Sequence, residues 1–351
     1  MIKQTLNDVC TLIVDCEHKT ASIQPMGIPS IRTPNIGKGR LILDTVDRVS
    51  EETYIAWTKR AIPQANDLIL AREAPIGNVA IILPKQKVCL GQRTVLIRPN
   101  KNKVDFQYLC YLLLGDEIQG KIISVSNGAT VHHLNLEDIR SLELPELPPL
   151  PTQRKIAVIL SAYDDLIENN TRRIKILEEM AQALYREWFV KFRFPGHEKV
   201  KIVESELGMM PEGWEVKGLE DVCLRITDGS HWSPKTVDDG YPMASVKDMN
   251  EWGFEISKCR KVAKEDYEEL IRNDCKPLKG DVLIAKDGSY LKHIFVTEKE
   301  LELVVLSSIA IIRPNNQILP HVLSLYLREP SIKDRMAGYV SGVAQDCFER
   351  F

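Results

Sequence analysis

Three short stretches of the sequence carry residue types that could do chemistry. His132-His133 is a pair of imidazoles, Gly37-Lys38-Gly39-Arg40 is a glycine-rich basic turn, and Glu215-Val216-Lys217 has the acid–x–lysine order of a nuclease core. Adjacent residues on a strand point to opposite faces, so the two histidines do not favour a shared metal ion. The glycine turn lacks the spacing and the Ser/Thr of a phosphate loop. Glu212, the preceding acid, is too close to Glu215 to come from a separate strand.

Other catalytic patterns are missing from the sequence. It contains no G-x-G-x-x-G, no G-x-S-x-G elbow and no C-x-x-C pair among its 8 cysteines. Cys10 and Cys16, or Cys259 and Cys275, fit buried thiols in a reducing cytoplasm better than disulfides or metal ligands. The residue pattern therefore predicts no catalysis, no metal site and no cofactor in this chain.

The residues that remain for function are hydrogen-bond donors in polar loops. Such side chains can donate hydrogen bonds to the acceptor groups of a ligand. The alternative for each of them is a solvated surface charge. The candidate binding residues are, in the first half of the chain, Lys19, Arg32, Lys38, Arg40, Arg72, Asn127, His132 and His133, and in the second half His231, Lys235, Lys247, Lys286, Ser289, Tyr290 and Lys292.

A long helix is the first element expected to position these loops. After Pro148-Pro149-Leu150-Pro151, the chain continues for about forty residues without Pro or Gly, until Phe194-Pro195-Gly196. Proline is not tolerated in a helix interior, so the pattern predicts a helix over residues 148–194, with Thr152 as a candidate N-cap. At ~1.5 Å per residue this helix is about 60 Å long.

Apolar residues on this helix recur in steps of four and three, which is the spacing of a coiled-coil seam. Their burial would contribute well over ~10 kcal/mol of gross stabilisation, which requires a partner surface. A lone polar Asn in the seam fixes register. The alternative is an ordinary amphipathic core helix. The predicted partner-binding seam consists of Ile156, Leu160, Tyr163, Ile167, Asn170, Ile174, Leu177, Ala181, Leu184 and Trp188.

The sequence on either side of the helix is repeated. Residues 67–71 return as 281–285, and Arg98-Pro99-Asn100 returns as Arg313-Pro314-Asn315, both at a separation of about 214 residues. The fold class predicted is α+β, with two similar globular α/β domains separated by one long coiled-coil-type helix. Their loops differ, which suits one scaffold with two binding surfaces. The expected boundaries are 1–147 for the first domain, 148–194 for the helix, 195–210 for a linker and 211–351 for the second domain.

Within the first domain, local patterns predict individual elements. Apolar runs bounded by turn residues indicate strands at 67–71, 78–83 and 94–97. Residues 106–114 are predicted to form a helix.

Composition limits the class of protein. The chain has 351 residues, with 46 Lys and Arg against 49 Asp and Glu, so it is not a simple basic nucleic-acid binder and any basic surface must be local. No apolar run approaches the ~20 residues of a membrane span, and the N-terminus has no signal-peptide pattern. We therefore expect a cytoplasmic protein without a membrane partner.

Several motifs carry a family resemblance. The stretch from Leu147 to Asp165 reads LPPLPTQRKIAVILSAYDD and is followed by Asn169-Asn170 and by MAQALYREWF at 180–189. These motifs resemble the spacer helix of the specificity subunits of type I restriction-modification systems. Pro211-Glu212-Gly213-Trp214 is similar to that family's entry into a second target-recognition domain. The resemblance covers the whole chain, is specific in the spacer and is architectural in the domains.

The resemblance implies a DNA-recognition subunit that reads a bipartite, asymmetric double-stranded site, so we predict that the candidate binding residues named above contact DNA. Arg and Lys suit guanine edges and phosphates, and Asn suits adenine. It implies docking of two modification subunits, which carry S-adenosylmethionine and methylate adenine, and of a restriction subunit that cleaves with ATP and Mg²⁺. The family has a second spacer helix after its second recognition domain, and this sequence lacks it, so we expect a homodimer or an obligate complex through the first. The alternative is a truncated or decoy scaffold subunit that binds partners without specific DNA reading.

Overall fold

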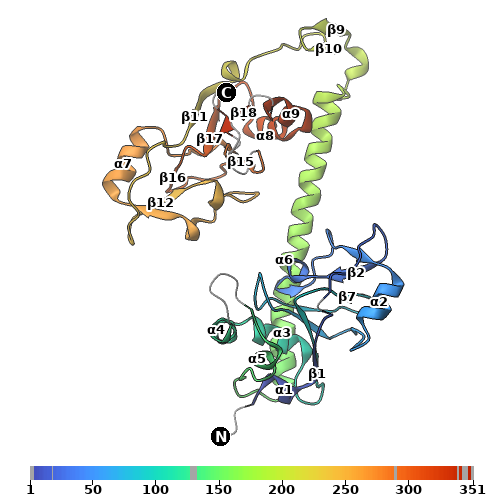
Figure 1. Cartoon of the computed structure of the whole chain (residues 1–351). Coiled ribbons are helices and arrows are strands. Elements are labelled where there is room, and N and C mark those ends of the chain that lie inside the picture. Colours follow the sequence, from blue (N-terminus) through green and yellow to red (C-terminus); the bar gives the residue numbers. More distant parts are fainter. Residues whose placement is uncertain are drawn as a thin grey trace. The chain divides into compact units, whose positions relative to one another are not determined.

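The computed structural model describes residues 4–17, 19–126, 133–287, 291–337, 340–341 and 347–348. The chain forms two compact units, residues 1–170 and 171–351, which are described separately below. Each unit combines β-sheets with short helices, and the long helix α6 (Leu150–Tyr185) contributes residues to both (Figure 1). This mixed architecture confirms the predicted fold class.

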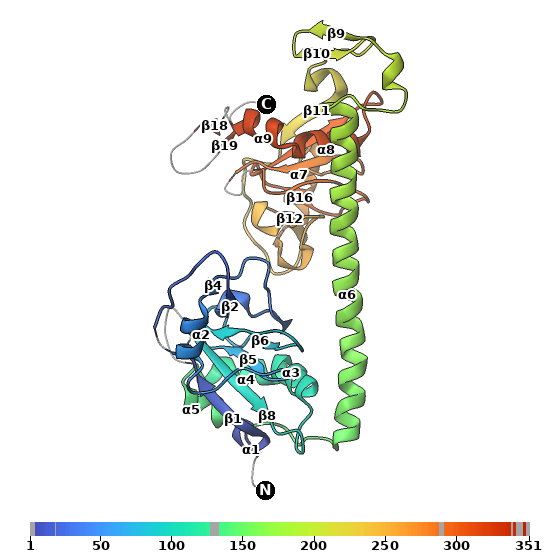
Figure 2. The same cartoon turned by 90° about the vertical axis from the view of Figure 1, so that its right-hand side faces the viewer.

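The main sheet of the first unit has five strands in the order β1-β8-β5-β6-β3 (Figure 2). A smaller sheet has the order β4-β2-β7. The strands predicted at 67–71, 78–83 and 94–97 are confirmed as β5, β6 and β8. The strands are β1 (Cys10–Asp15), β2 (Ile28–Ile31), β3 (Gly39–Arg40), β4 (Arg48–Val49), β5 (Leu68–Ala71), β6 (Val79–Ile81), β7 (Cys89–Leu90) and β8 (Thr94–Pro99).

Both faces of this main sheet are covered by a hydrophobic core. Alternate residues of each strand point to opposite faces and so belong to different cores. Leu68 and Leu70 of β5 pack in the core beneath helices α3 and α4, whereas Ile69 and Ala71 pack toward the smaller sheet. The prediction for residues 106–114 is confirmed by α3, whose N-cap Asp105 accepts bonds from two backbone amides. The helices of this unit are α1 (Leu6–Val9), α2 (Glu51–Trp57), α3 (Phe106–Leu114), α4 (Asp116–Val125) and α5 (Leu136–Arg140).

The second unit repeats this arrangement. Its main sheet has the order β11-β17-β14-β15, its smaller sheet has the order β13-β12-β16, and β14 alternates between two cores as β5 does. The two units therefore share one scaffold. Its elements are η4 (Leu219–Val222), β11 (Cys223–Asp228), β12 (Tyr241–Ala244), β13 (Arg260–Val262), α7 (Lys264–Arg272), β14 (Val282–Ala285), β15 (Ile294–Val296), β16 (Val304–Val305), β17 (Ile309–Pro314), α8 (Pro320–Arg328) and α9 (Pro330–Ala337), followed by β18 (Val340–Ser341) and β19 (Cys347–Phe348).

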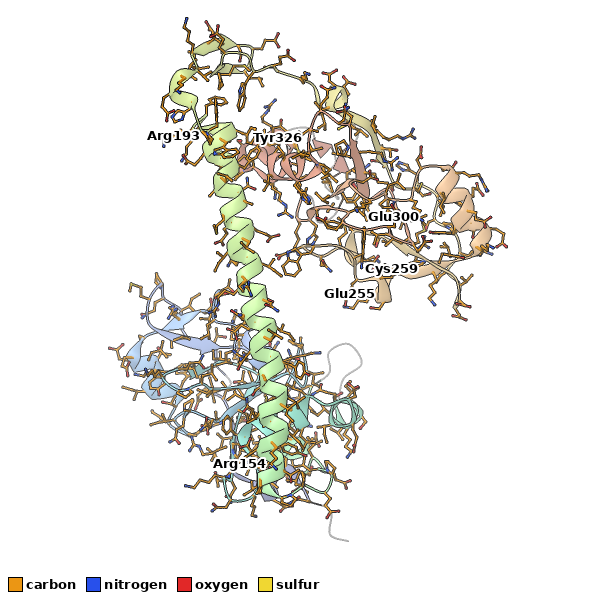
Figure 3. The ribbon with its side chains drawn as sticks, turned by 180° about the vertical axis from the view of Figure 1, so that it is seen from behind. Arg154, Arg193, Glu255, Cys259, Glu300 and Tyr326 are labelled. Carbon is orange, nitrogen blue, oxygen red and sulfur yellow. The ribbon has the colours of Figure 1, made fainter. Side chains whose placement is uncertain are left out.

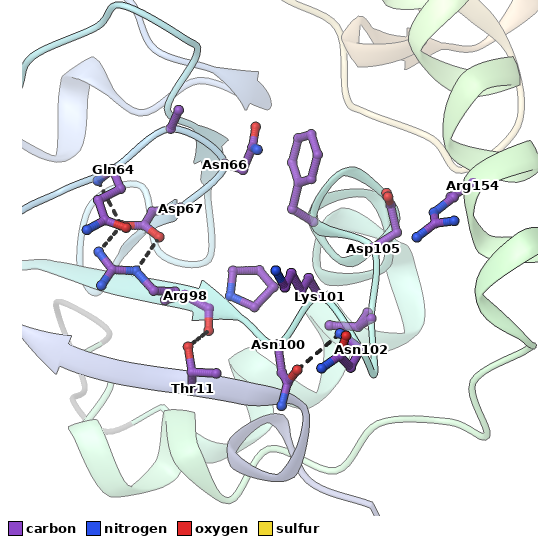
Figure 4. Close-up of a pocket in the computed structure, with 14 residues that line it drawn as sticks. Thr11, Gln64, Asn66, Asp67, Arg98, Asn100, Lys101, Asn102, Asp105 and Arg154 are labelled. Atoms are coloured by element: carbon purple, nitrogen blue, oxygen red, sulfur yellow. Dashed lines mark hydrogen bonds and ion pairs between the residues drawn. The ribbon is translucent and has the colours of Figure 1, made fainter.

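A buried ion pair explains the most visible part of the sequence repeat. Asp67 accepts two hydrogen bonds from Arg98, at 2.8 and 2.7 Å, and one from the amide of Gln64 (Figure 4). The bonds to Asp67 raise the pKa of the Arg98 guanidinium. Asp281 and Arg313 form the same pair at 2.8 and 2.9 Å. Both carboxylates are almost fully buried, so each domain depends on its arginine to compensate that charge.

Helix α6 differs from its prediction at both ends. It begins at Leu150, so Thr152 lies inside the first turn and the N-cap prediction is wrong. The early start is possible because the first-turn amides of a helix have no intrahelical partner, so Pro151 loses no bond there. The regular helix gives way to a π-helical segment, η2 (Arg186–Val190), and ends before Phe194. Its 36 residues span ~54 Å.

The segment expected to be a linker, residues 195–210, contains ordered structure. A short helical turn, η3 (His197–Lys199), precedes the hairpin of β9 (Ile202–Ser205) and β10 (Gly208–Pro211). Trp214 stacks on Phe194 with ring centroids 5.5 Å apart and lies 5.7 Å from Phe189. Aromatic packing thus connects the end of α6 to the start of the second domain.

Candidate nucleic-acid interface

One edge of the main sheet collects several loops in the first unit. Strands β1 and β5 end there, and β8 begins there, because β8 is antiparallel to both. The loops are joined by backbone bonds: the amide of Arg72 donates to Arg93 at 2.9 Å, and the amide of Gly91 donates to Ile31 at 2.7 Å. We call residues 16–17, 19–20, 32–35, 72–78 and 91–93 the first loop edge.

The second unit has a corresponding edge. The amide of Lys286 donates to Ser308 at 2.8 Å, and the amide of Ser230 donates to Val305 at 2.8 Å. The amide of Val246 donates to the Ser308 hydroxyl at 3.3 Å, which brings in a further loop. We call residues 229–235, 245–248, 286–287, 291–293 and 306–308 the second loop edge.

Charged side chains form a network of ion pairs and hydrogen bonds on the first loop edge. Glu73 accepts from Arg93 at 2.9 Å and contacts Nδ1 of His133 at 2.6 Å. A guanidinium nitrogen of Arg72 lies 3.0 Å from Nε2 of the same imidazole. Since a guanidinium can only donate, Nε2 accepts, and the ring carries its proton on Nδ1 toward Glu73. Arg60 pairs with Asp15 nearby.

Three of the residues predicted to contact DNA are bonded to other residues of their own unit. Arg72 and Lys286 are only 6% and 4% exposed. Arg72 donates to the Leu134 carbonyl at 2.7 Å, and Lys286 donates to Asp228 at 2.5 Å. Arg40 pairs with two acids of α6, Asp165 and Glu168. We therefore leave these three cations out of the proposed interface.

The other predicted contacts fall into three groups: partly exposed residues, residues outside the described ranges, and exposed residues. Arg32 is half-exposed and pairs with Asp47 at 2.9 Å, and His133 is partly exposed. Asn127, His132, Ser289 and Tyr290 lie outside the described residues. The remaining side chains are exposed on the two units: Lys19 and Lys38, and His231, Lys235, Lys247 and Lys292.

Sequence reasoning missed two residues of these edges and one arginine that contacts the first edge. Arg60 and Arg93 are partly exposed arginines oriented by acidic neighbours, and Trp232 is a half-exposed indole. Arg93 could have been noticed, because it directly precedes the predicted strand at 94–97. Arg60 lies in a loop far from the edge in sequence, so nothing local marks it.

The predicted seam of α6 is exposed in the structure, with Tyr163, Ile167 and Leu177 each more than 60% exposed. Figure 3 draws the side chains along this helix, with Arg154 near its N-terminal end. The other seam positions are exposed too, except Trp188, which is half-buried: Ile156, Leu160, Asn170, Ile174, Ala181 and Leu184.

The two units dock on α6 through a different, mostly polar face. In the first unit Gln153 is buried, donating to the Pro148 carbonyl and accepting from the Asp105 amide. Tyr111 donates to Asp164 at 2.6 Å, and burial, together with this carboxylate, raises the pKa of the phenol. In the second unit Glu329 accepts from both Gln182 and Arg186, at 2.8 and 2.9 Å.

The described residues offer no metal centre. In that part of the chain, no three His, Cys, Asp or Glu side chains are grouped so that they could hold a metal ion. In the same ranges, no helix combines the length and apolarity needed to cross a membrane.

Comparison with known proteins gives a consistent picture. Residues 3–179 match the family model for the type I restriction modification DNA specificity domain. The chain is 28% identical over 271 residues to the type I restriction enzyme MjaIX specificity subunit of Methanocaldococcus jannaschii, covering 75% of this chain and 60% of that protein. It is 38% identical over 154 residues to the HindI specificity subunit of Haemophilus influenzae, covering 43% of this chain and 33% of that protein. The chain thus spans less than two thirds of the length of either relative.

A solved structure shows the same fold. The type I restriction-modification S subunit from M. genitalium superposes with a TM-score of 0.52 at 17% sequence identity, covering 96% of this chain and 79% of that one.

Proposed function

The chain belongs to the type I restriction modification DNA specificity family, and from this membership we propose that it reads the DNA sequence for a restriction-modification complex. The observation that carries this proposal is the repeated scaffold with two different loop edges. Each domain reads one half of a bipartite, asymmetric double-stranded site.

Equivalent positions on the two edges hold different residues. Ala71 pairs with Thr94 in the first unit as Ala285 pairs with Ile309 in the second. Thr94 and Ile309 are therefore equivalent, and so are the residues that precede them, Arg93 in the first unit and Ser308 in the second. An arginine can donate two parallel bonds to guanine, whereas a serine can bond to several bases. One scaffold thus presents two distinct sets of donors.

The exposed seam of α6 is the proposed docking surface for helices of two modification subunits, with a restriction subunit completing the complex. An apolar stripe of this length is typical of a protein interface. The chain itself holds no cofactor in this proposal. S-adenosylmethionine, ATP and Mg²⁺ belong to the partner subunits, so the isolated chain neither methylates nor cuts DNA.

A second candidate function is a scaffold that assembles the complex without reading DNA. The observation that favours it is the pairing of edge cations with acids: Arg32 with Asp47, Arg60 with Asp15, and Arg93 with Glu73. Such pairs weaken the attraction of a surface for phosphates.

Selection from a pool of random duplex DNA separates the two functions. The purified chain is incubated with the pool, with and without a modification subunit, and retained duplexes are sequenced. Enrichment of one split motif is the expected result. Assembly with the modification subunit but no enriched motif would leave the scaffold function and refute sequence reading.

A further inference from the structure

A large aromatic side chain is held in solvent on the second loop edge. Trp232 is 47% exposed in the loop of residues 229–234, and the neighbouring His231 is more exposed still. Tryptophan is highly buried on average in folded proteins. An indole presented in this way is therefore a candidate contact for a ligand.

The loop that presents this indole is fixed by its own serine. The Ser230 hydroxyl donates to the Trp232 carbonyl at 2.7 Å and accepts from the Trp232 amide at 3.0 Å. The Ser230 carbonyl also accepts from the amide of Ser307 at 2.9 Å. The backbone on the N-terminal side of the indole is thus bonded to the sheet.

Both ends of the loop are also held in place, one by close backbone packing and the other by hydrogen bonds. A Cβ at Gly229 would lie 2.3 Å from the Val305 carbonyl oxygen, so only glycine fits there without displacing the backbone. At the other end, Arg260 donates to the Pro234 carbonyl at 2.9 Å and to the Ser233 hydroxyl at 2.8 Å. A loop ordered before binding loses little conformational entropy when a ligand arrives.

The surroundings of the indole favour DNA over a protein as its ligand. Lys235, Lys247 and Lys292 are exposed on the same loop edge. Lysine is depleted in protein–protein interfaces, whereas cations that bind phosphates surround the base contacts of DNA-binding surfaces.

The first unit places a DNA-contact candidate at the same position. Asp15 and Asp228 end equivalent strands, facing Val95 and Ala310 in the same register. Four residues further along the chain are Lys19 and Trp232, and both are exposed. The same loop position thus holds a cationic side chain in the first unit and an aromatic side chain in the second.

We infer that the loop of residues 229–234 is a preformed reading element, in which Trp232 packs against a base edge in a DNA groove and His231 donates a hydrogen bond beside it. Ser230, Gly229 and Arg260 act as positioning residues. This inference rests on the proposed function and adds to it the residues that read the second half-site.

The test compares Trp232→Ala with Trp252→Ala, which removes a second half-exposed indole of the same unit, 51% exposed. Trp252 lies outside the second loop edge, and its indole donates to Glu178 of α6 at 3.2 Å. Each variant is assembled with the modification subunits and incubated with random duplex DNA. Affinity is then measured on the duplex that the wild-type complex selects. Trp232→Ala is expected to weaken binding roughly tenfold or more and to relax one or two positions in a single half of the motif, on the scale of a lost base contact. Trp252→Ala should retain both halves.

A third variant isolates the role of the loop backbone. Ser230→Ala keeps the indole but removes both bonds between the Ser230 hydroxyl and the Trp232 backbone. It should therefore relax the same positions of the DNA motif as Trp232→Ala does. Thermal unfolding and the untouched half of the motif report whether each complex is intact.

Three results would overturn the inference. In the first, Trp232→Ala leaves the selected motif and the DNA affinity unchanged. In the second, it lowers the affinity no more than Trp252→Ala does. In the third, it disturbs assembly while the motif stays the same, which would indicate that Trp232 contacts a protein. Each of these leaves the proposed function standing. A wild-type complex that selects no split motif would instead refute the proposed function and this inference together.

Discussion

Replacement of Leu177 by aspartate tests whether the exposed seam of α6 is a docking surface. Leu177 is 61% exposed, and full burial of a leucine side chain contributes roughly 1.5–3 kcal/mol, so a partner covering it gains ~1–2 kcal/mol. An aspartate there would bring an unpaired charge into an apolar contact, which adds further cost. We expect the dissociation constant for assembly to rise by about 100-fold or more, equivalent to ~3 kcal/mol. The free chain should keep its stability within ~0.5 kcal/mol, because the position is exposed.

The assay is titration of the chain with purified modification subunit, followed by light scattering at micromolar concentration. Leu224→Asp is the control, because Leu224 is 72% exposed but lies on β11 rather than on α6. Light scattering of the chain alone shows whether a second copy covers the seam, and that dimer should also dissociate in Leu177→Asp. Assembly of Leu177→Asp as tightly as the wild type, alone and with the modification subunit, would refute the reasoning.

The remaining predictions concern stability, thiol chemistry and spacing. Arg313→Ala leaves the buried carboxylate of Asp281 without its partner and should destabilise the second unit by ~3–5 kcal/mol in denaturant unfolding. Arg98→Ala should do the same to Asp67 in the first unit, and a loss below ~1 kcal/mol would contradict this. Cys110 is fully buried, and burial raises the pKa of its thiol to about 12, so mass spectrometry at pH 8 should find it unalkylated until the chain unfolds. A four-residue insertion after Asn170 lengthens α6 by ~6 Å and should widen the gap in the selected DNA motif by one or two base pairs. An unchanged gap would show that α6 does not set the spacing.

The strands and the repeat could be predicted from sequence because their signals are local. Both faces of β5 and β14 are covered, so their sequences are continuous apolar runs. The Asp that precedes each run is buried and pairs with an arginine of the neighbouring strand. The helix predicted at 106–114 matched α3, since its apolar residues and its capping Asp105 are consecutive in sequence.

The roles of individual cations could not be predicted, because they depend on partners distant in sequence. Arg72 looked like a loop donor, but its guanidinium bonds to Leu134 and lies beside His133, both brought close by the fold. Arg40 looked the same and pairs instead with Asp165. The docking face of α6 was also missed, because periodicity marks apolar residues, whereas Gln153 and its neighbours dock through hydrogen bonds.

Exchange of one domain tests the central claim most directly. Residues 1–147 are replaced by the corresponding domain of another family member, and the hybrid and the parent are each assembled with modification subunits and incubated with random duplex DNA. Two independent reading domains predict that one half of the selected motif changes while the other half keeps its sequence. A hybrid in which both halves change, or in which neither does, would contradict the account.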